Sequence, residues 1–176
     1  MNRCISIVFC PLACYLFLTS CMCKNAKQAT AVNTMWYSGL PQCPCENPDK
    51  NSIALQDGWA KDAGNINHYH KGASECFRSY PAITTAEGQS CQQCCYDSGG
   101  HLISYGSGAG TPDKISTCDG EDSNGKMKTK FSRVLDHYIK DVKPWEEFGG
   151  IDSGWKKYNQ LWVPDTGTGC SGIKAK

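Results

Sequence analysis

The hydrophobic pattern predicts one amphipathic helix over residues 131–142. Apolar residues recur there at offsets of 0, 3, 4, 7, 8 and 11: Phe131, Val134, Leu135, Tyr138, Ile139 and Val142. Polar and charged residues fill the positions between them, so the apolar side chains share one face of a helix. Pro144 disfavours helical geometry at Lys143, and the helix is expected to end there.

A second pattern predicts a hairpin over residues 94–105. Cys95-Tyr96 leads into Asp97-Ser-Gly-Gly100, which has turn chemistry, and His101–Tyr105 is a strand-like run. The glycines of residues 106–110 cannot continue that strand. Further on, Trp155, Tyr158 and Trp162 are expected to cover the helix and hairpin, although large aromatic residues with a polar edge also serve binding surfaces.

The start of the chain predicts a secretory signal peptide over residues 1–23. Arg3 precedes an uncharged apolar run from Cys4 to Leu18. The run is about 15 residues long, shorter than the roughly 20 that span a bilayer, and no second run follows, so we expect no membrane anchor. Cleavage is expected between Ser20 and Ala26, although Cys21 also fits a bacterial lipoprotein site. Residues 24–42 lack periodicity and are predicted to be a linker.

Thirteen of the 176 residues are cysteine, which in a secreted chain indicates disulfides rather than thiols. Beyond the linker lie Cys43, Cys45, Cys76, Cys91, Cys94, Cys95, Cys118 and Cys170. We expect all of these in bridges, although connectivity stays open apart from the unfavourable Cys43–Cys45 and Cys94–Cys95 pairings. The predicted protein is a monomer, or a disulfide-linked dimer if the mature chain retains Cys23. The fold class is α+β: a small disulfide-rich extracellular domain with short strands and much irregular loop.

Charge excludes one class of partner. The chain has 18 basic and 17 acidic residues, a net charge of +1, and the two signs are interspersed. Nucleic acid is therefore not an expected partner. Lys126, Lys128 and Lys130 form the densest basic run, which is predicted to be solvated, with a glycan or membrane contact as the alternative.

No pattern predicts a catalytic, cofactor or metal site. The loop Gly106–Gly110 runs into Thr-Pro-Asp instead of a helix, so it lacks the geometry of a phosphate cradle. His68 and His70 are two residues apart, as two zinc ligands on one strand can be, but no third candidate ligand lies at a spacing typical of zinc sites. The acidic loop Asp119–Gly125 lacks the ligand register of a calcium loop. His137 has no nucleophile tied to it by a motif.

Several blocks together resemble the AMOP domain, in particular that of the isthmins. The most specific are Gln93-Cys-Cys-Tyr96 and Gly108-Ala-Gly-Thr-Pro112, preceded by Cys43-Pro-Cys45 and followed by Asp141-Val-Lys-Pro-Trp145. The resemblance implies an extracellular, disulfide-bonded module for cell adhesion or cell-surface signalling, with no established catalytic residues.

The chain also departs from the isthmin pattern. Isthmins have a cysteine shortly after the Pro-Trp, where this chain has Glu146-Glu-Phe148, while Cys91 and Cys118 are additional. The disulfide map is therefore not carried over. Their integrin-type Lys-Gly-Asp is replaced by Gly149-Gly-Ile-Asp-Ser-Gly154, so integrin binding is not carried over either.

These observations predict a secreted, non-catalytic AMOP-like domain over residues 43–170 with a tail over 171–176. The expected partner is a cell-surface or matrix protein. The expected contacts come from the loop 106–113 and the segment 145–162: Gly108, Thr111, Asp113, Trp145, Trp155, Tyr158 and Trp162. The alternative is a structural or protective protein of mucus, cuticle or matrix, cross-linked through an unpaired cysteine.

Overall fold

The structure is a computed structural model, and it describes residues 35–50, 58–121, 127–167 and 170. All of these belong to one unit that spans residues 34–176. The predicted signal peptide and tail lie outside the described residues, as does most of the predicted linker, so these boundaries stay predictions. None of the helices in the described ranges is both long and apolar enough to cross a bilayer.

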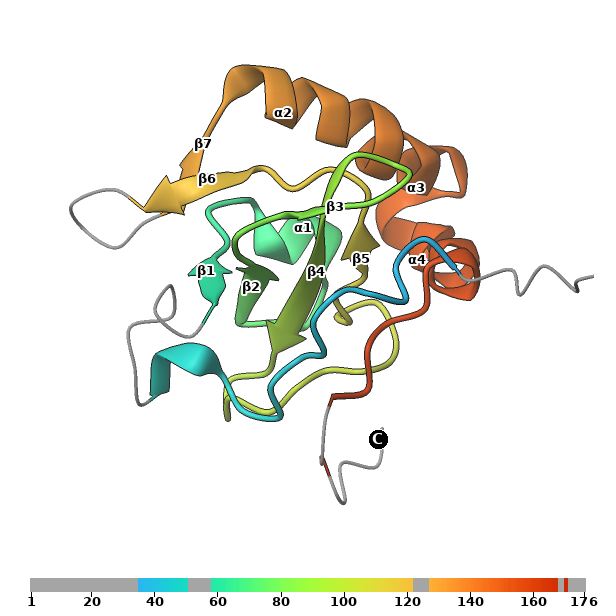
Figure 1. Ribbon diagram of the computed structural model, residues 1–176. Coiled ribbons are helices and arrows are strands. Elements are labelled where there is room, and N and C mark those ends of the chain that lie inside the picture. The colour runs from blue at the N-terminus through green and yellow to red at the C-terminus, as the bar shows by residue number, and fades with distance from the viewer. Residues whose placement is uncertain (1–34, 51–57, 122–126, 168–169, 171–176) are drawn as a thin grey trace, which may run out of the picture. The chain divides into compact units, whose positions relative to one another are not determined.

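A five-stranded antiparallel sheet forms the centre of this unit (Figure 1). Its strands are β1 (Trp59–Lys61), β2 (Glu75–Ser79), β3 (Ile83–Thr84), β4 (Gln89–Tyr96) and β5 (Pro112–Asp113). They follow the order β1-β2-β4-β3, and β5 also pairs with β4. β4 therefore joins most of the sheet, and its residues from Ser90 to Tyr96 are all buried.

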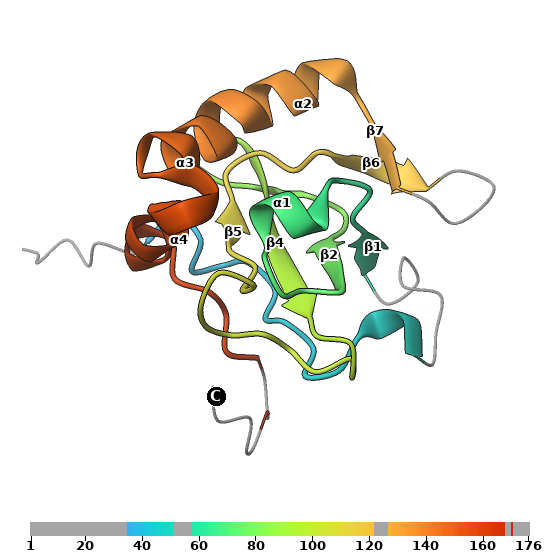
Figure 2. The same ribbon diagram turned by 180° about the vertical axis from the view of Figure 1, so that it is seen from behind.

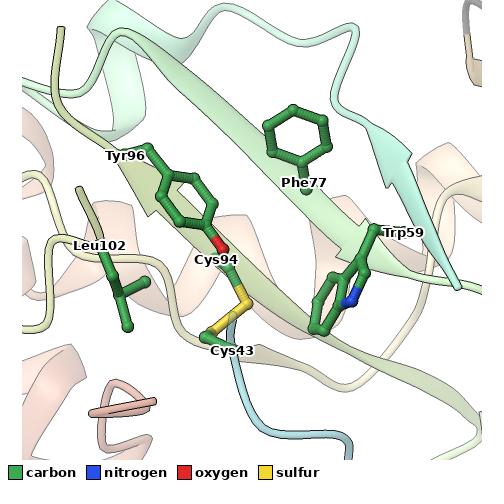
Figure 3. Packing of buried hydrophobic residues seen from close by; sticks show 6 residues of the cluster. All are labelled: Cys43, Trp59, Phe77, Cys94, Tyr96 and Leu102. Atoms are coloured by element: carbon green, nitrogen blue, oxygen red, sulfur yellow. A yellow bond between two sulfur atoms is a disulfide. The ribbon is translucent and has the colours of Figure 1, made fainter. Parts of the chain in front are cut away.

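The register of the strands gives the sheet one apolar and one polar face, because residues directly opposite each other point the same way. Phe77 lies opposite Cys94 and Trp59 opposite Ser79 on the apolar face, while Arg78 lies opposite Gln93 on the polar face. The apolar face carries the main core cluster of Cys43, Trp59, Phe77, Cys94, Tyr96 and Leu102 (Figure 3). Within it the rings of Phe77 and Tyr96 meet edge to face, with centroids 5.8 Å apart.

Three disulfides tie the sheet to distant parts of the chain. They join Cys43 to Cys94, Cys45 to Cys170, and Cys76 to Cys95. The last connects directly opposed residues of β2 and β4. Cys118 is fully buried against Ala60 and Tyr80, and its participation in a bridge stays a prediction.

Cys91 departs from the expectation that it forms a disulfide. It is a fully buried thiol whose Sγ lies 3.8 Å from Oδ2 of Asp113. The reason lies in its position on β4, where register sets it opposite Asp113 on the polar face of the sheet. The number of cysteines in the sequence does not show which of them lies opposite a carboxylate instead of another cysteine.

The main helices follow the strands of the sheet in the chain and lie beside one another along one side of it (Figures 1 and 2). They are α2 (Phe131–His137), the π-helical η2 (Tyr138–Val142), α3 (Lys143–Glu147) and α4 (Gly150–Leu161). Shorter elements are η1 (Pro48–Lys50), α1 (Ile66–Tyr69) and the hairpin of β6 (Cys118–Glu121) and β7 (Met127–Thr129).

The predicted helix over 131–142 is confirmed, but its predicted end at Lys143 is wrong. The helical path continues through Pro144 to Glu147. A proline in a helix lacks the N–H group for the usual bond and crowds the carbonyl four residues before it. Here a π turn precedes it, in which the Lys143 amide donates to the Tyr138 carbonyl, so the regular pattern is already widened.

Much of the apolar stripe of this helix faces outward, and Val134, Tyr138 and Val142 at its edge line a cavity. Phe131 is 84% exposed, Leu135 49% and Ile139 52%. An amphipathic helix ordinarily turns such a stripe to the core. Here the helix covers the polar face of the sheet, so its polar side, with His137 and Asp141, turns inward.

The predicted hairpin is present, with a shorter return strand. The Asp97 amide donates to the His101 carbonyl over 3.0 Å, and Gly100 has a φ of 79° that favours glycine in the turn. The return consists of isolated bridges, from His101 to Glu46 and from Leu102 to Tyr96. The chain then leaves the sheet, because Leu102 enters the apolar core.

Candidate functional site

A buried ionic network occupies the polar face of the sheet. The guanidinium group of Arg78, on β2, pairs with Asp62 through Nη1 and donates from Nε to Oδ2 of Asp113 over 2.8 Å. The Arg78 side chain is 7% exposed and both carboxylates are 5% exposed. The planar fork of arginine suits such a double pairing, which joins β2 to β5 and to the loop after β1.

Asp141 attaches the helices to the sheet. Its Oδ1 accepts the Lys114 amide over 2.9 Å and its Oδ2 accepts the Ile115 amide over 3.1 Å. Nδ1 of His137 lies 3.0 Å from both Oδ2 of Asp141 and the Ile115 carbonyl. Both are acceptors, so Nδ1 carries a proton. The inward side of the helix is thus held by hydrogen bonds rather than by apolar packing.

Burial and charge shift several pKa values in this network. Burial raises the pKa of Asp62, but Arg78 and the Gly64 amide outweigh it and the net pKa is lowered. Burial lowers the pKa of His137, but Asp113 and Asp141 outweigh it and the net pKa is raised. Burial also raises the pKa of the Asp113 carboxyl, against the opposing effect of Arg78. For His70, burial is the largest effect, and the net pKa is lowered.

The shift of His137 predicts a pH dependence of stability. A folded-state pKa above the unfolded value means that the folded protein binds more protons, so the free energy of unfolding falls as pH rises through the folded pKa of His137. The contribution is complete below about pH 6.5, and its slope is at most about 1.4 kcal/mol per pH unit. Urea unfolding between pH 5.5 and 8.5 should show this decline in the parent protein and lose it in His137→Gln. Equal declines in both proteins would contradict the assignment.

A cavity of about 350 Å³ lies between this network and the helices. Arg78, Asp113 and Asp141 line it from the buried side, and Asn65 and Tyr138 are exposed residues of its lining. Aromatic rings line it as well, from Tyr69, Trp145, Trp155 and Tyr158. The arrangement offers charged groups and aromatic walls in one cavity that is open to solvent on one side.

Five of the seven expected contact residues meet at this cavity. They are Thr111, Asp113, Trp145, Trp155 and Tyr158, whereas Gly108 and Trp162 are outside its lining. They face an internal space instead of forming an open surface. Gly108, Thr111, Asp113, Trp145 and Tyr158 are buried, and the two other tryptophans are half-buried. The loop 106–113 packs inward, and Gly110 lies so close to the backbone of Gln93 that any side chain there would collide with it.

The candidate ligands considered from the sequence take structural positions. Nδ1 of His70 lies 3.0 Å from the Ala109 carbonyl, and exposed His68 packs its ring against Tyr69 and Trp145. His70 also lies near Cys76 and Cys95, which form a disulfide. Residues 122–126 of the acidic loop are outside the described ranges.

Asp113, His137 and Asp141 place their ligand atoms within 4.8 Å of one another. Their ion pairs and hydrogen bonds to Arg78 and to the amides of residues 114 and 115 account for this cluster. It serves as a structural bridge between sheet and helix.

Sequence reasoning missed Arg78, Asp62 and Asp141 as members of the site. One signal was present: Arg78 directly follows the apolar pair Cys76-Phe77 in a short strand, of which all residues but Glu75 are buried. A charge at such a position is rarely fully buried without a partner. The partners are 16 and 35 positions away, and the sequence does not identify them.

Comparison with known proteins adds a family and a relative. Residues 18–171 match the AMOP domain family model. The chain is 31% identical over 134 residues to human (Homo sapiens) Sushi domain-containing protein 2, a match that covers 72% of this chain and 14% of that protein. No solved structure matches.

Proposed function

The chain belongs to the AMOP domain family, and on that premise we propose that it is a secreted, non-catalytic module that binds an extracellular protein through the outward face of α2 and η2. The partner is a cell-surface or matrix protein with an apolar surface ringed by acidic residues. The human relative is much longer than this chain, which spans 14% of it, so its partners are not assumed here.

The exposed apolar stripe carries this proposal. Its members are Phe131, Val134, Leu135, Tyr138 and Ile139, each at least 40% exposed. Contiguous apolar patches on soluble proteins mark interaction sites, and anchors spaced by three and four residues are the usual pattern of helix-face recognition.

The charges beside the stripe favour an acidic partner. Lys128, Lys130, Lys140 and Lys143 are exposed in residues 128–143, where the exposed acid is Asp136. Lys130 and Lys143 pair with Asp119 and Glu147, and exposed Glu146 accepts the Tyr138 hydroxyl, so Lys128 and Lys140 carry the attraction to an acidic partner. Opposite charges across an interface speed association and exclude like-charged surfaces.

The face is also held in place before binding. Asp141 fastens η2 to the segment after β5, and that segment continues from a sheet closed by disulfides. A surface that is already ordered loses less conformational entropy when a partner binds.

The test uses a double variant, Leu135→Glu with Ile139→Glu, in the oxidised, full-length protein. Binding to intact animal cells, measured by flow cytometry, is expected to weaken at least tenfold, with secretion and far-UV circular dichroism unchanged because both side chains are exposed. The matched control is Ile151→Glu with Leu161→Glu on α4, two residues that are each 44% exposed, and it should bind as the parent does.

Each other outcome points elsewhere. Equal binding by both double variants and the parent would refute the assigned face. Absence of binding by the parent, judged against reduced and alkylated protein on several cell types, would refute the function. Equal binding to protein-free anionic vesicles would indicate a membrane instead of a protein partner.

The alternative of a cross-linked structural protein receives no support from Cys91. That thiol is 0% exposed, so it cannot react with another chain while the domain is folded. The alternative, and the disulfide-linked dimer with it, rests on cysteines such as Cys23 that lie outside the described residues.

A further inference from the structure

We infer that the cavity between the sheet and the helices binds a small organic ammonium ion, with its cationic group toward the buried carboxylates and its apolar body against the aromatic walls. This inference does not rest on the proposed protein-binding face. Val134 and Tyr138 of that face also line the cavity, but Leu135 and Ile139, the two residues changed in the binding test, do not.

The cavity has the size and the layout of a ligand site. Its volume of about 350 Å³ lies in the range of natural small-molecule pockets, roughly 300–1,000 Å³. Its lining runs from buried Arg78 and Asp113 to exposed Asn65, Thr129 and Tyr138. A ligand can therefore enter past the exposed residues and reach the ionic network.

The walls suit a cation with an apolar body. The rings of Tyr69 and Trp145 lie 5.4 Å apart, centroid to centroid, at an interplanar angle of 62°. Trp155 and Tyr158 add aromatic surface from α4. Aromatic faces attract ammonium groups, and the attraction grows when water is excluded.

The charge of the network favours a cation over an anion or a neutral molecule. Three carboxyl groups line the cavity, from Asp62, Asp113 and Asp141, against the guanidinium group of Arg78 and the imidazole of His137. The acidic groups of this network therefore outnumber the basic ones. Burial lowers the pKa of His70, so that side chain adds no positive charge at neutral pH. Uncompensated charge acts strongly in a buried site, where water screens it little.

The test is a titration of the oxidised, full-length protein with three probes of similar shape. Binding is measured by calorimetry and by tryptophan fluorescence. The probes are phenethylammonium, 2-phenylethanol and 3-phenylpropionate, which are cationic, neutral and anionic. The cation is expected to bind at least tenfold more tightly than the other two. A fourth probe, Nα-acetyl-lysine methylamide, distinguishes a partner's lysine side chain from a free amine as the source of the ammonium group.

Matched tryptophan variants locate the binding. Trp155 and Trp162 are both half-buried, but only Trp155 lines the cavity. Trp155→Ala should weaken phenethylammonium at least fivefold while cell binding persists, and Trp162→Ala should leave the affinity unchanged. Equal affinity for the three charges, no binding of the cation at millimolar concentration, or equal losses in the two variants would overturn the inference. The probe series on the parent protein decides the matter even if a variant does not fold.

Discussion

Arg78→Met is expected to lower the free energy of unfolding by about 3–5 kcal/mol, because it removes one member of a buried ionic network and leaves the others without their partner. Asp62 and Asp113 would then be buried carboxylates without an arginine. Methionine has a similar length and no charge, so the loss reflects mainly the missing ion pairs. Urea unfolding at pH 7 with the disulfides intact measures it.

Arg133→Met is the matched control. Arg133 is half-buried, donates from Nη1 to the Cys118 carbonyl over 2.8 Å and lies 3.7 Å from Asp119, so its loss should cost about 1 kcal/mol. Adding Asp113→Asn to Arg78→Met should recover part of the loss, since it removes one of the two stranded charges. Equal losses for the two arginines would mean that Arg78 does not organise the domain.

The sequence predicted those elements whose signals are local. The helix over 131–142 follows from its periodicity, and the turn over 97–100 from its residue types. α4 was missed, although Ile151, Trp155, Tyr158 and Trp162 are spaced by four, three and four residues. Glycines at 149, 150 and 154 concealed that spacing because glycine disfavours helices. Gly154 is required there, since a side chain at this position would collide with the Trp145 carbonyl.

Whether the apolar face of the predicted helix turns inward or outward depends on tertiary contacts, which the periodicity of the sequence does not show. Apolar spacing identifies a face of the helix, and the layer beneath decides whether that face turns inward. Here the layer beneath is a sheet face built around Arg78 and Asp113, residues 35 positions apart. The candidate site shows the same limit. Five of the aromatic and loop residues singled out from the sequence lie together, but residue types alone do not separate a surface from the lining of a cavity.

The disulfide between Cys43 and Cys94 links the N-terminal segment of the described unit to the centre of the sheet. Both cysteines are 1% exposed and belong to the apolar core with Trp59, Phe77 and Tyr96 (Figure 3). Around this bridge, the Cys43 amide donates to Asp165 over 3.0 Å and the Tyr96 hydroxyl donates to the Pro44 carbonyl over 2.9 Å. Further along the segment, Cys45 forms a disulfide with Cys170 and its carbonyl accepts the Leu102 amide. Each hydrogen bond contributes about 1 kcal/mol, less than a disulfide does.

Replacing Cys43 and Cys94 together by alanine is therefore expected to cost about 4–5 kcal/mol, of which loop closure over 51 residues supplies about 4 kcal/mol and the lost sulfur packing the rest. The matched control replaces Cys76 and Cys95, which also involve β4 and are also fully buried but close only 19 residues. Loop closure supplies about 3 kcal/mol there, so with a similar loss of sulfur packing the control should cost about 1 kcal/mol less than the first pair. Guanidinium unfolding of the two double variants gives the order. A larger loss for the pair that closes the shorter loop would mean that strain or packing, and not restriction of the unfolded chain, decides what these bridges contribute. Since whole domains are stable by about 5–15 kcal/mol, secretion of the Cys43 and Cys94 double variant should fall sharply.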